Sequence, residues 1–389
     1  MTDKAKKKLI RITTVPISLE KLLSGQLHFM TDYYQVIGVS SGGEKLDLVA
    51  QKEHIKVHAV ELTRKITPLK DLKAVFDLFL FLKKEKPFIV HSHTPKAGTI
   101  GMLAAKLAGV PHRLHTVAGL PLLEATGKKR KVLDFVEKIT YSCATKVYPN
   151  SKGLKEIILQ NGYCAADKLK VLANGSSNGI DTSHFNPELI SEEQKASLRH
   201  QYGIQANDLV FIFVGRLVKD KGINELIAAF DKISQTNSQV KLLLVGRYEP
   251  DLDPLKPETL ALIESNKAII SAGYQIDVRP FFGIAKALVF PSYREGFPNV
   301  VMQASAMSLP CIVSNINGCN EIVIEGQNGF IIPVKSEQAI FEAMQKLCNQ
   351  PQLLETLREK ARDLIVSRYE QRIVWQAILE EYEKLELNE

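Results

Sequence analysis

The chain has 389 residues, of which 45% are hydrophobic and 24% are charged. This composition excludes disordered, collagen-like and small disulfide-rich proteins, and the length predicts two globular domains at roughly 150 residues each. Five cysteines without a C-x-x-C pair argue against a disulfide framework and a zinc site, and they fit a reducing cytoplasm. We expect no signal peptide and no membrane span, because the longest apolar stretch, residues 74–82, is far shorter than the ~20 residues that cross a bilayer.

Charge is distributed unevenly along the chain. Residues 1–185 carry 29 Lys and Arg against 16 Asp and Glu, a net charge of +13, whereas residues 186–389 carry 21 against 27, a net charge of −6. The basic residues concentrate in two clusters, Lys4, Lys6, Lys7, Lys8 and Arg11, and Lys128, Lys129, Arg130 and Lys131. A basic surface attracts phosphates, whether of nucleic acid, lipid head groups or a diphosphate-linked substrate.

Short apolar runs alternate with helical patterns from end to end. Strands are predicted at 9–14, 34–39, 88–91, 112–116, 144–148 and 169–172, and then at 209–214, 241–245, 287–290, 310–313 and 329–333. Helices are predicted between them, for example at 69–84, 99–108, 223–235, 299–308 and 337–349, with a long final helix at 362–387. This alternation predicts two parallel sheets with helices on both faces, joined through the polar stretch 183–207.

The second basic cluster opens a helical pattern in which Val132, Phe135, Val136, Ile139 and Cys143 share one side. Such a helix could lie on an anionic membrane. It could equally pack this side into the core and leave its basic end in solvent. The sequence leaves both interpretations open.

Ligands of open parallel sheets bind beyond the carboxyl ends of the strands, so the loops there are the candidates for chemistry. In the loop 214–222, Gly215 allows a tight turn, and Arg216 and Lys221 supply two cations that suit a phosphate. The same residues could also form a plain surface turn with two solvated cations.

The loop 290–304 carries a second group. Pro298 is expected as the first helical residue, which would leave the amides of Gly296, Phe297 and Asn299 free as an anion site. Glu295 suits hydrogen bonding to sugar hydroxyls, and Gln303, one turn into the helix, suits ribose hydroxyls. The alternative is a helix cap without function. A third loop, 317–322, again places amides at this edge.

These loops make the sequence resemble the retaining GT-B glycosyltransferases (group 1, family 4 type) of bacterial capsule and lipopolysaccharide synthesis. The matching segments in the second half are Gly215-Arg216-Leu217, Lys221-Gly222, Pro291-Ser292, Glu295-Gly296-Phe297, Ala306-Met307, Leu309-Pro310, Gly318 and Glu321-Ile322-Val323. Those in the first half are His91 to Gly98, His115 to Gly119 and Pro149-Asn150-Ser151, which resemble the branch acting on undecaprenyl-diphosphate-linked sugars.

The resemblance implies an α/β fold of the GT-B class, two Rossmann-like domains facing each other across a cleft. Residues 1–185 would form the acceptor-binding domain and residues 186–365 the donor-binding domain, and the C-terminal helix from about 366 to 389 would pack back on the first. Arg216, Lys221, Glu295 and His115 would be catalytic. Donor binding would use these first three residues together with Gly25, Gly215, Gly296, Phe297, Asn299 and Gln303.

For three of the site residues in the first half of the chain, a second interpretation stays open. Gly25 permits close approach of the backbone to a diphosphate, but it could belong to a plain turn. His115 could face the reacting centre or be a structural histidine. His93 is expected to contact the acceptor and Lys96 its diphosphate; a metal at His91 and His93 lacks a third ligand. Where the family usually has a second glutamate, this chain has Gln303, which keeps an acceptor and loses the charge.

The resemblance implies sugar transfer from a nucleotide sugar, UDP being preferred over GDP, to a lipid-diphosphate-linked acceptor, without cofactor or metal. The enzyme would act in the cytoplasm, on the inner face of an anionic membrane. Asp251-Leu252-Asp253 lacks the apolar strand that a metal site of this pattern needs. The alternatives are a sugar-nucleotide epimerase, which lacks the Arg–Lys and Glu-Gly-Phe grouping, and a nucleic-acid-binding protein, which requires stacking aromatics that the basic clusters do not contain.

Overall fold

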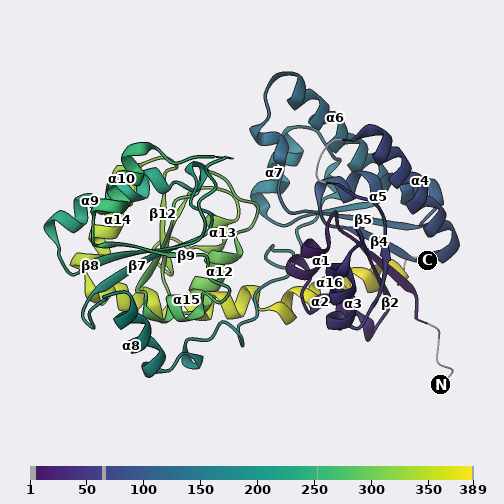
Figure 1. Cartoon of the computed structure of the whole chain (residues 1–389). Helices are drawn as coiled ribbons and strands as arrows, with labels where there is room; N and C mark the ends of the chain where they lie inside the picture. Colours follow the sequence, from purple (N-terminus) through teal and green to yellow (C-terminus); the bar gives the residue numbers. More distant parts are fainter. Residues whose placement is uncertain (1–5, 64–66, 252, 388–389) are drawn as a thin grey trace. The chain divides into compact units, whose positions relative to one another are not determined.

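The computed structural model describes residues 6–63, 67–251 and 253–387, so Lys4 of the first basic cluster and Leu252 lie outside the described residues. The chain forms two compact units, Met1–Gly179 with Arg372–Glu389, and Ile180–Gln371 (Figure 1). Each unit has one six-stranded parallel sheet. No helix in the described part of the chain is both long and apolar enough to traverse a lipid bilayer.

In the first unit the strand order is β3-β2-β1-β4-β5-β6. The strands are β1 (Lys8–Ile12), β2 (Gln35–Ser40), β3 (Lys56–Ala59), β4 (Ile89–Ser92), β5 (His112–Val117) and β6 (Lys146–Pro149). One face is covered by α1 (Pro16–Leu22), α2 (Gln26–Thr31), α3 (Glu44–Glu53) and α16 (Gln371–Leu387). The other face is covered by α4 (Pro68–Glu85), α5 (Pro95–Ala108), α6 (Gly127–Cys143) and α7 (Lys152–Gln160).

In the second unit the order is β12-β11-β10-β7-β8-β9. The strands are β7 (Leu209–Val214), β8 (Val240–Val245), β9 (Ile269–Gly273), β10 (Ala287–Phe290), β11 (Cys311–Ser314) and β12 (Gly329–Ile332). The helices are α8 (Glu192–Gln201), α9 (Ile223–Thr236), α10 (Pro257–Ser265), α11 (Arg279–Ile284), α12 (Asn299–Ala306), α13 (Cys319–Ile322), α14 (Glu337–Asn349) and α15 (Pro351–Tyr369). The central strands are buried on both faces, which accounts for their continuous apolar runs.

Both sheets have the same topology, with the first strand of the unit in the middle of the sheet. The chain proceeds from it to one edge, returns, and then builds the other half, so the order reverses between β1 and β4 and between β7 and β10. Ligands of doubly wound sheets bind at this reversal, beyond the carboxyl ends of the strands. The loops after β7 and β10, and those after β1 and β4, are therefore the candidate ligand-binding loops of the two units.

Two strands were not predicted and one predicted strand is absent. β3 and β9 lie at sheet edges and carry mixed polar and apolar residues, so they lack the continuous apolar run on which the prediction depends. Residues 169–172 do not form a strand, because the only bridge there joins Leu169 to Val147 within the described chain. The other predicted strands lie within two residues of observed ones.

The prediction of one final helix at 362–387 is wrong. α15 ends at Tyr369 and α16 begins at Gln371, because Glu370 between them has φ −55° and ψ 138°. Ile180 occupies this break: its amide donates to Tyr369 O (2.8 Å), and its carbonyl accepts from the amide of Gln371 (3.1 Å). The two backbone segments at which the chain passes between the units, around Ile180 and around Glu370, are therefore hydrogen-bonded to each other.

The predicted junction at 183–207 lies inside the second unit, because Ile190 and Ile204 from this stretch are buried in the core of that unit. The chain passes from the first unit to the second after Gly179, and it returns after Gln371. From there Trp375 and Leu379 of α16 are buried against α1, α2 and α3 in the first unit.

Candidate active site

Four loops of the second unit meet at the carboxyl edge of its sheet. Arg216 and Lys221 follow β7, Glu249 follows β8, Glu295 follows β10 and Asn317 follows β11. β8, β7, β10 and β11 are consecutive neighbours in the sheet, so the four loops leave it side by side. Arg216, Lys221 and Glu295, which the sequence predicts as site residues, therefore lie together at the point where the strand order reverses.

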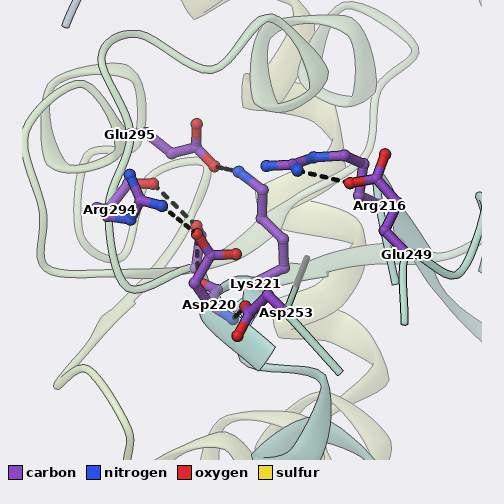
Figure 2. Close-up of polar contacts among 8 residues, drawn as sticks. Arg216, Asp220, Lys221, Glu249, Asp253, Arg294 and Glu295 are labelled. Atoms are coloured by element: carbon purple, nitrogen blue, oxygen red, sulfur yellow. Dashed lines mark hydrogen bonds and ion pairs between the residues drawn. The ribbon is translucent and has the colours of Figure 1, made fainter. Parts of the chain in front are cut away.

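Lys221 and Glu295 form the central contact of this group (Figure 2). The Lys221 ammonium donates to Glu295 Oε1, and the side chains are only 14% and 16% exposed. Arg216 forms a second pair, in which Nη1 donates to Glu249 Oε2 (2.8 Å). This hydrogen bond raises the pKa of Arg216, and the charges of Asp220 and Glu295 act in the same direction. The two predicted phosphate-binding cations are therefore each held by a carboxylate.

A third ion pair lies beneath Lys221. Arg294 Nη2 donates to Asp220 Oδ2 (2.6 Å), and the amide of Asp220 donates to Asp253 Oδ2 (2.7 Å). Asp253 thus fixes the loop after β7. Glu249, Asp220 and Arg294 were not predicted as site residues, because nothing in their local sequence distinguishes them from ordinary charged loop residues.

Two glycines allow these loops to approach one another. Gly222 has φ +72°, and a Cβ atom there would lie 2.2 Å from the carbonyl oxygen of Pro291, the residue after β10. Gly318 has φ +77°, and its Cβ would lie 2.5 Å from Gly296 O. Only glycine combines this left-handed backbone with so close a contact. The Asn317 side chain adds hydrogen bonds to the carbonyls of Glu295 and Gly296, which fixes the loop that carries Glu295.

The loop before α12 leaves backbone donors available. Within the described residues, the amides of Gly296, Phe297 and Asn299 have no hydrogen-bond acceptor, as expected for a helix start. The expectation that Pro298 is the first helical residue is wrong: Pro298 is the N-cap, with φ −76° and ψ 110°. Its non-helical ψ places the start of α12 one residue later.

The remaining donor-site residues of this unit are placed as follows. Gly215 continues β7, and its amide donates to Val245 O (2.9 Å). The Phe297 ring packs on Tyr369, with 5.4 Å between centroids, so this side chain is used in the core. The Gln303 side chain is half-buried and forms no hydrogen bond within the part of the chain that is described. Its contact with ribose stays a prediction.

In the first unit His115 is buried rather than exposed at the sheet edge. It is 3% exposed, its Nδ1 is 2.8 Å from Ser92 Oγ, and its ring lies so close to α5 that a Cβ on Gly98 would be 2.4 Å from Cε1. Burial lowers the pKa of His115 to about 4, so the ring is neutral near pH 7. Its catalytic role stays a prediction.

His93 is also buried, at 2% exposure. Its Nε2 accepts a hydrogen bond from Arg11 Nε (2.9 Å), which leaves the ring proton on Nδ1. Burial, with the positive charge of Arg11 nearby, holds the pKa of His93 well below its usual range. Its ring lies beside that of His91, with 4.2 Å between centroids. His91 in turn contacts Tyr382 and Thr116, so both imidazoles belong to a buried polar layer.

Lys96 and Gly25 each already have an acidic partner. Lys96 Nζ lies 2.5 Å from Asp71 Oδ2. The amide of Gly25 donates to Glu53 Oε1 (2.9 Å), and the amide of His28 in the same turn donates to Glu53 Oε2 (3.1 Å). A phosphate at the Gly25 amide would have to replace the Glu53 carboxylate, and one at Lys96 would compete with Asp71 for the ammonium. Across residues 6–63, 67–251 and 253–387, no three His, Cys, Asp or Glu side chains gather as a metal site.

Known proteins resemble this chain over nearly its whole length. The family model "Glycosyl transferases group 1" matches residues 194–364, and the model "Glycosyl transferase 4-like domain" matches residues 35–175. The capsular polysaccharide biosynthesis glycosyltransferase CapM of Staphylococcus aureus is 34% identical over 95% of this chain and 95% of its own length. An Escherichia coli UDP-Gal:alpha-D-GlcNAc-diphosphoundecaprenol alpha-1,3-galactosyltransferase is 31% identical over 79% of this chain and 78% of its own.

The fold is shared with solved structures at lower identity. The structure of Anabaena Alr3699/HepE in complex with UDP and glucose superposes with a TM-score of 0.80 at 19% identity, covering 97% of this chain and 100% of that one. Together with the two six-stranded parallel sheets, this likeness confirms the predicted α/β fold of the GT-B class with two Rossmann-like units.

Proposed function

Because the chain belongs to the group 1 glycosyl transferases, we propose that it transfers a sugar from a UDP-sugar to a lipid-diphosphate-linked acceptor during synthesis of a bacterial surface glycan, with retention. Support comes from the functions of its relatives, which include a capsular enzyme and a diphosphoundecaprenol-dependent galactosyltransferase, and from the UDP bound to a protein of the same fold. Family membership does not favour the epimerase or nucleic-acid-binding alternatives.

The observation that carries the proposal is the grouping of Arg216, Lys221 and Glu295 at the strand-order reversal of the second unit. In the proposal the donor diphosphate takes Arg216 and Lys221 from their carboxylate partners. The free amides before and at the start of α12 add donors to the phosphate. Glu295, released from Lys221, accepts hydrogen bonds from hydroxyls of the sugar, and Gln303 contacts the ribose.

The proposed step breaks the bond between the anomeric carbon and the diphosphate oxygen, whose electron pair leaves with UDP. The acceptor hydroxyl forms the new bond on the same face of the sugar, and its proton goes to an oxygen of the departing phosphate. Arg216, Lys221 and the amides stabilise the charge that develops on the diphosphate. The proposal therefore assigns no metal ion and no cofactor to the reaction.

The first unit is proposed to bind the acceptor. Lys96 would exchange Asp71 for the acceptor's diphosphate, which the short but partly exposed pair permits. His93 would contact the acceptor only after local opening, since it is almost fully buried. His115 is proposed to face the reacting centre, as predicted, with its ring neutral.

The acceptor would be reached at an anionic membrane on the cytoplasmic side, and we propose α6 as the contact. The beginning of this helix exposes Lys128, Lys129 and Lys131 together with Val132 (51%) and Phe135 (64%). Of the predicted apolar side, Cys143 is buried in the core, so the helix divides its apolar residues between the core and its outer surface. Lysines around exposed apolar side chains are typical of an interfacial helix.

Replacing Phe135 by serine is expected to weaken sedimentation with phosphatidylglycerol vesicles by about five- to tenfold, because roughly half of a phenylalanine's transfer free energy is lost. Vesicles of phosphatidylcholine alone should bind neither protein well. Phe76 of α4 is similarly exposed (58%) and lies outside the basic cluster, so Phe76→Ser is the matched control. Equal losses in the two variants would contradict the assignment to α6.

The proposed reaction is tested by incubating the protein with UDP- and GDP-sugars, with and without a polyprenyl-diphosphate-linked sugar, and measuring nucleotide release. We expect acceptor-dependent release of UDP.

Lys221→Met is expected to raise the donor KM by about tenfold or more, the value of one charge-assisted hydrogen bond. Lys232→Met removes a surface lysine that pairs with Glu337 and should change nothing. Lack of release from every UDP-sugar, or an unaltered KM in Lys221→Met, would refute the proposal.

A further inference from the structure

Glu249 is a carboxylate of the candidate site to which neither the resemblance nor the proposed reaction gives a role. It follows β8, its Oε2 accepts from Arg216 Nη1 at 2.8 Å, and its side chain is 32% exposed. Within the described chain this is the only hydrogen bond of its carboxylate. Figure 2 shows the Glu249 carboxylate turned toward the guanidinium of Arg216.

The charges around Glu249 are nearly balanced before any ligand binds. The group contains three cations and four carboxylates, which are Arg216, Lys221 and Arg294, and Asp220, Glu249, Asp253 and Glu295. Each cation is within hydrogen-bond distance of at least one of these carboxylates. A diphosphate that binds Arg216 and Lys221 therefore competes with Glu249 and Glu295 for the two cations.

Glu295 and Glu249 differ in what else their carboxylates can bind once the diphosphate holds the two cations. Glu295 lies after β10, beside the free amides, where the proposed function places the sugar. Glu249 lies after β8, on the other side of β7 from Glu295, and among the described residues its carboxylate bonds only Arg216. The Arg216–Glu249 pair is also more exposed than the Lys221–Glu295 pair, because the Arg216 side chain is 48% exposed and the Lys221 side chain only 14%. Exposed ion pairs are weak, so this pair opens and re-forms easily.

We propose that Glu249 is a resident competitor for the donor diphosphate: it neutralises Arg216 in the empty site and recaptures it as UDP leaves, which speeds product release. This inference rests on the proposed function. Its opposite is that Glu249 orients Arg216 for the diphosphate, in which case removing the carboxylate weakens binding.

Glu249→Gln separates the two possibilities, because it keeps the shape of the side chain and removes its charge. We expect the Kd for UDP, measured by titration calorimetry, to fall about two- to fivefold, the range of one exposed ion pair. UDP dissociation measured by stopped flow should slow by a similar factor. Glu355 pairs with Arg358 and lies near Lys286, at the amino end of β10, so Glu355→Gln is a matched control away from the site and should leave both values unchanged.

A double variant tests whether the effect acts through Arg216. In an Arg216→Met background, Glu249→Gln should alter UDP affinity by less than about twofold, since the pair is already gone. An equal gain in both backgrounds would indicate general repulsion and overturn the inference. Unchanged or weaker UDP binding by Glu249→Gln alone would also overturn it, while leaving the proposed function intact. If the wild type did not bind UDP, the proposed function itself would fall, and this inference with it.

Discussion

Glu295→Gln is expected to lower transferase turnover by about 100-fold or more while UDP binds at least as well as to the wild type. The carboxylate has two successive partners in the proposed reaction, Lys221 in the empty site and a sugar hydroxyl when the donor is bound. Glutamine can still accept a hydrogen bond, but it lacks the negative charge that stabilises the sugar as its bond to the diphosphate breaks. Removal of one preorganised electrostatic group of this kind typically costs about 10²–10³ in turnover.

The binding half of this expectation follows from the ion pair. UDP lacks the transferred sugar, so it gains nothing from Glu295, and a neutral side chain releases Lys221 for the diphosphate without competition. Steady-state kinetics and titration calorimetry with UDP measure the two quantities separately. Glu225 in the same unit accepts a hydrogen bond from Tyr293 (2.7 Å), and Glu225→Gln is the control for loss of a nearby carboxylate. Parallel losses of turnover and UDP affinity in Glu295→Gln would contradict the sugar-facing role.

The location of this site could be predicted from the sequence because it depends on strong local signals. The apolar run of β7 and the glycines at 215 and 222 mark a strand that ends in a tight turn. The apolar run of β10 and Gly296 in the loop before α12 mark a second strand that ends in a turn. Parallel strands bring their carboxyl ends to one edge, so two such signals suffice to place Arg216, Lys221 and Glu295 in one group.

The pairing of charges within the site could not be predicted. Whether Arg216 meets Glu249 or solvent depends on the path of the loop after β8, which no periodicity describes. The depth at which His115 is buried depends on how closely α5 approaches β5, and that approach requires Gly98. In the sequence, Gly98 is recognisable only as a residue of low helix propensity. The break at Glu370 likewise depends on backbone pairing with Ile180, about 190 residues away. Each of these features is decided by contacts distant in sequence.

Gly222→Ala is expected to destabilise the second unit by about 3 kcal/mol or more, which combines the cost of a left-handed alanine with that of displacing a neighbour. The clashing atom is the carbonyl oxygen of Pro291, at 2.2 Å, and backbone moves less easily than a side chain. Because this contact holds the loop of Lys221 against the loop of Glu295, relief of the clash would also separate their side chains. Thermal unfolding by calorimetry and UDP titration below the transition measure both consequences.

Gly203 offers the control that isolates the contact from the backbone conformation. It lies in the same unit with φ +64°, but a Cβ there would meet nothing within 4 Å. Gly203→Ala should therefore cost only about 1–2 kcal/mol, the price of the left-handed conformation, and leave UDP affinity unchanged. If the two variants lost equal stability, Gly222 would be required for its backbone angle alone. In that case close packing of the two loops would not explain why Lys221 and Glu295 meet, and their ion pair would have to form through the side chains themselves.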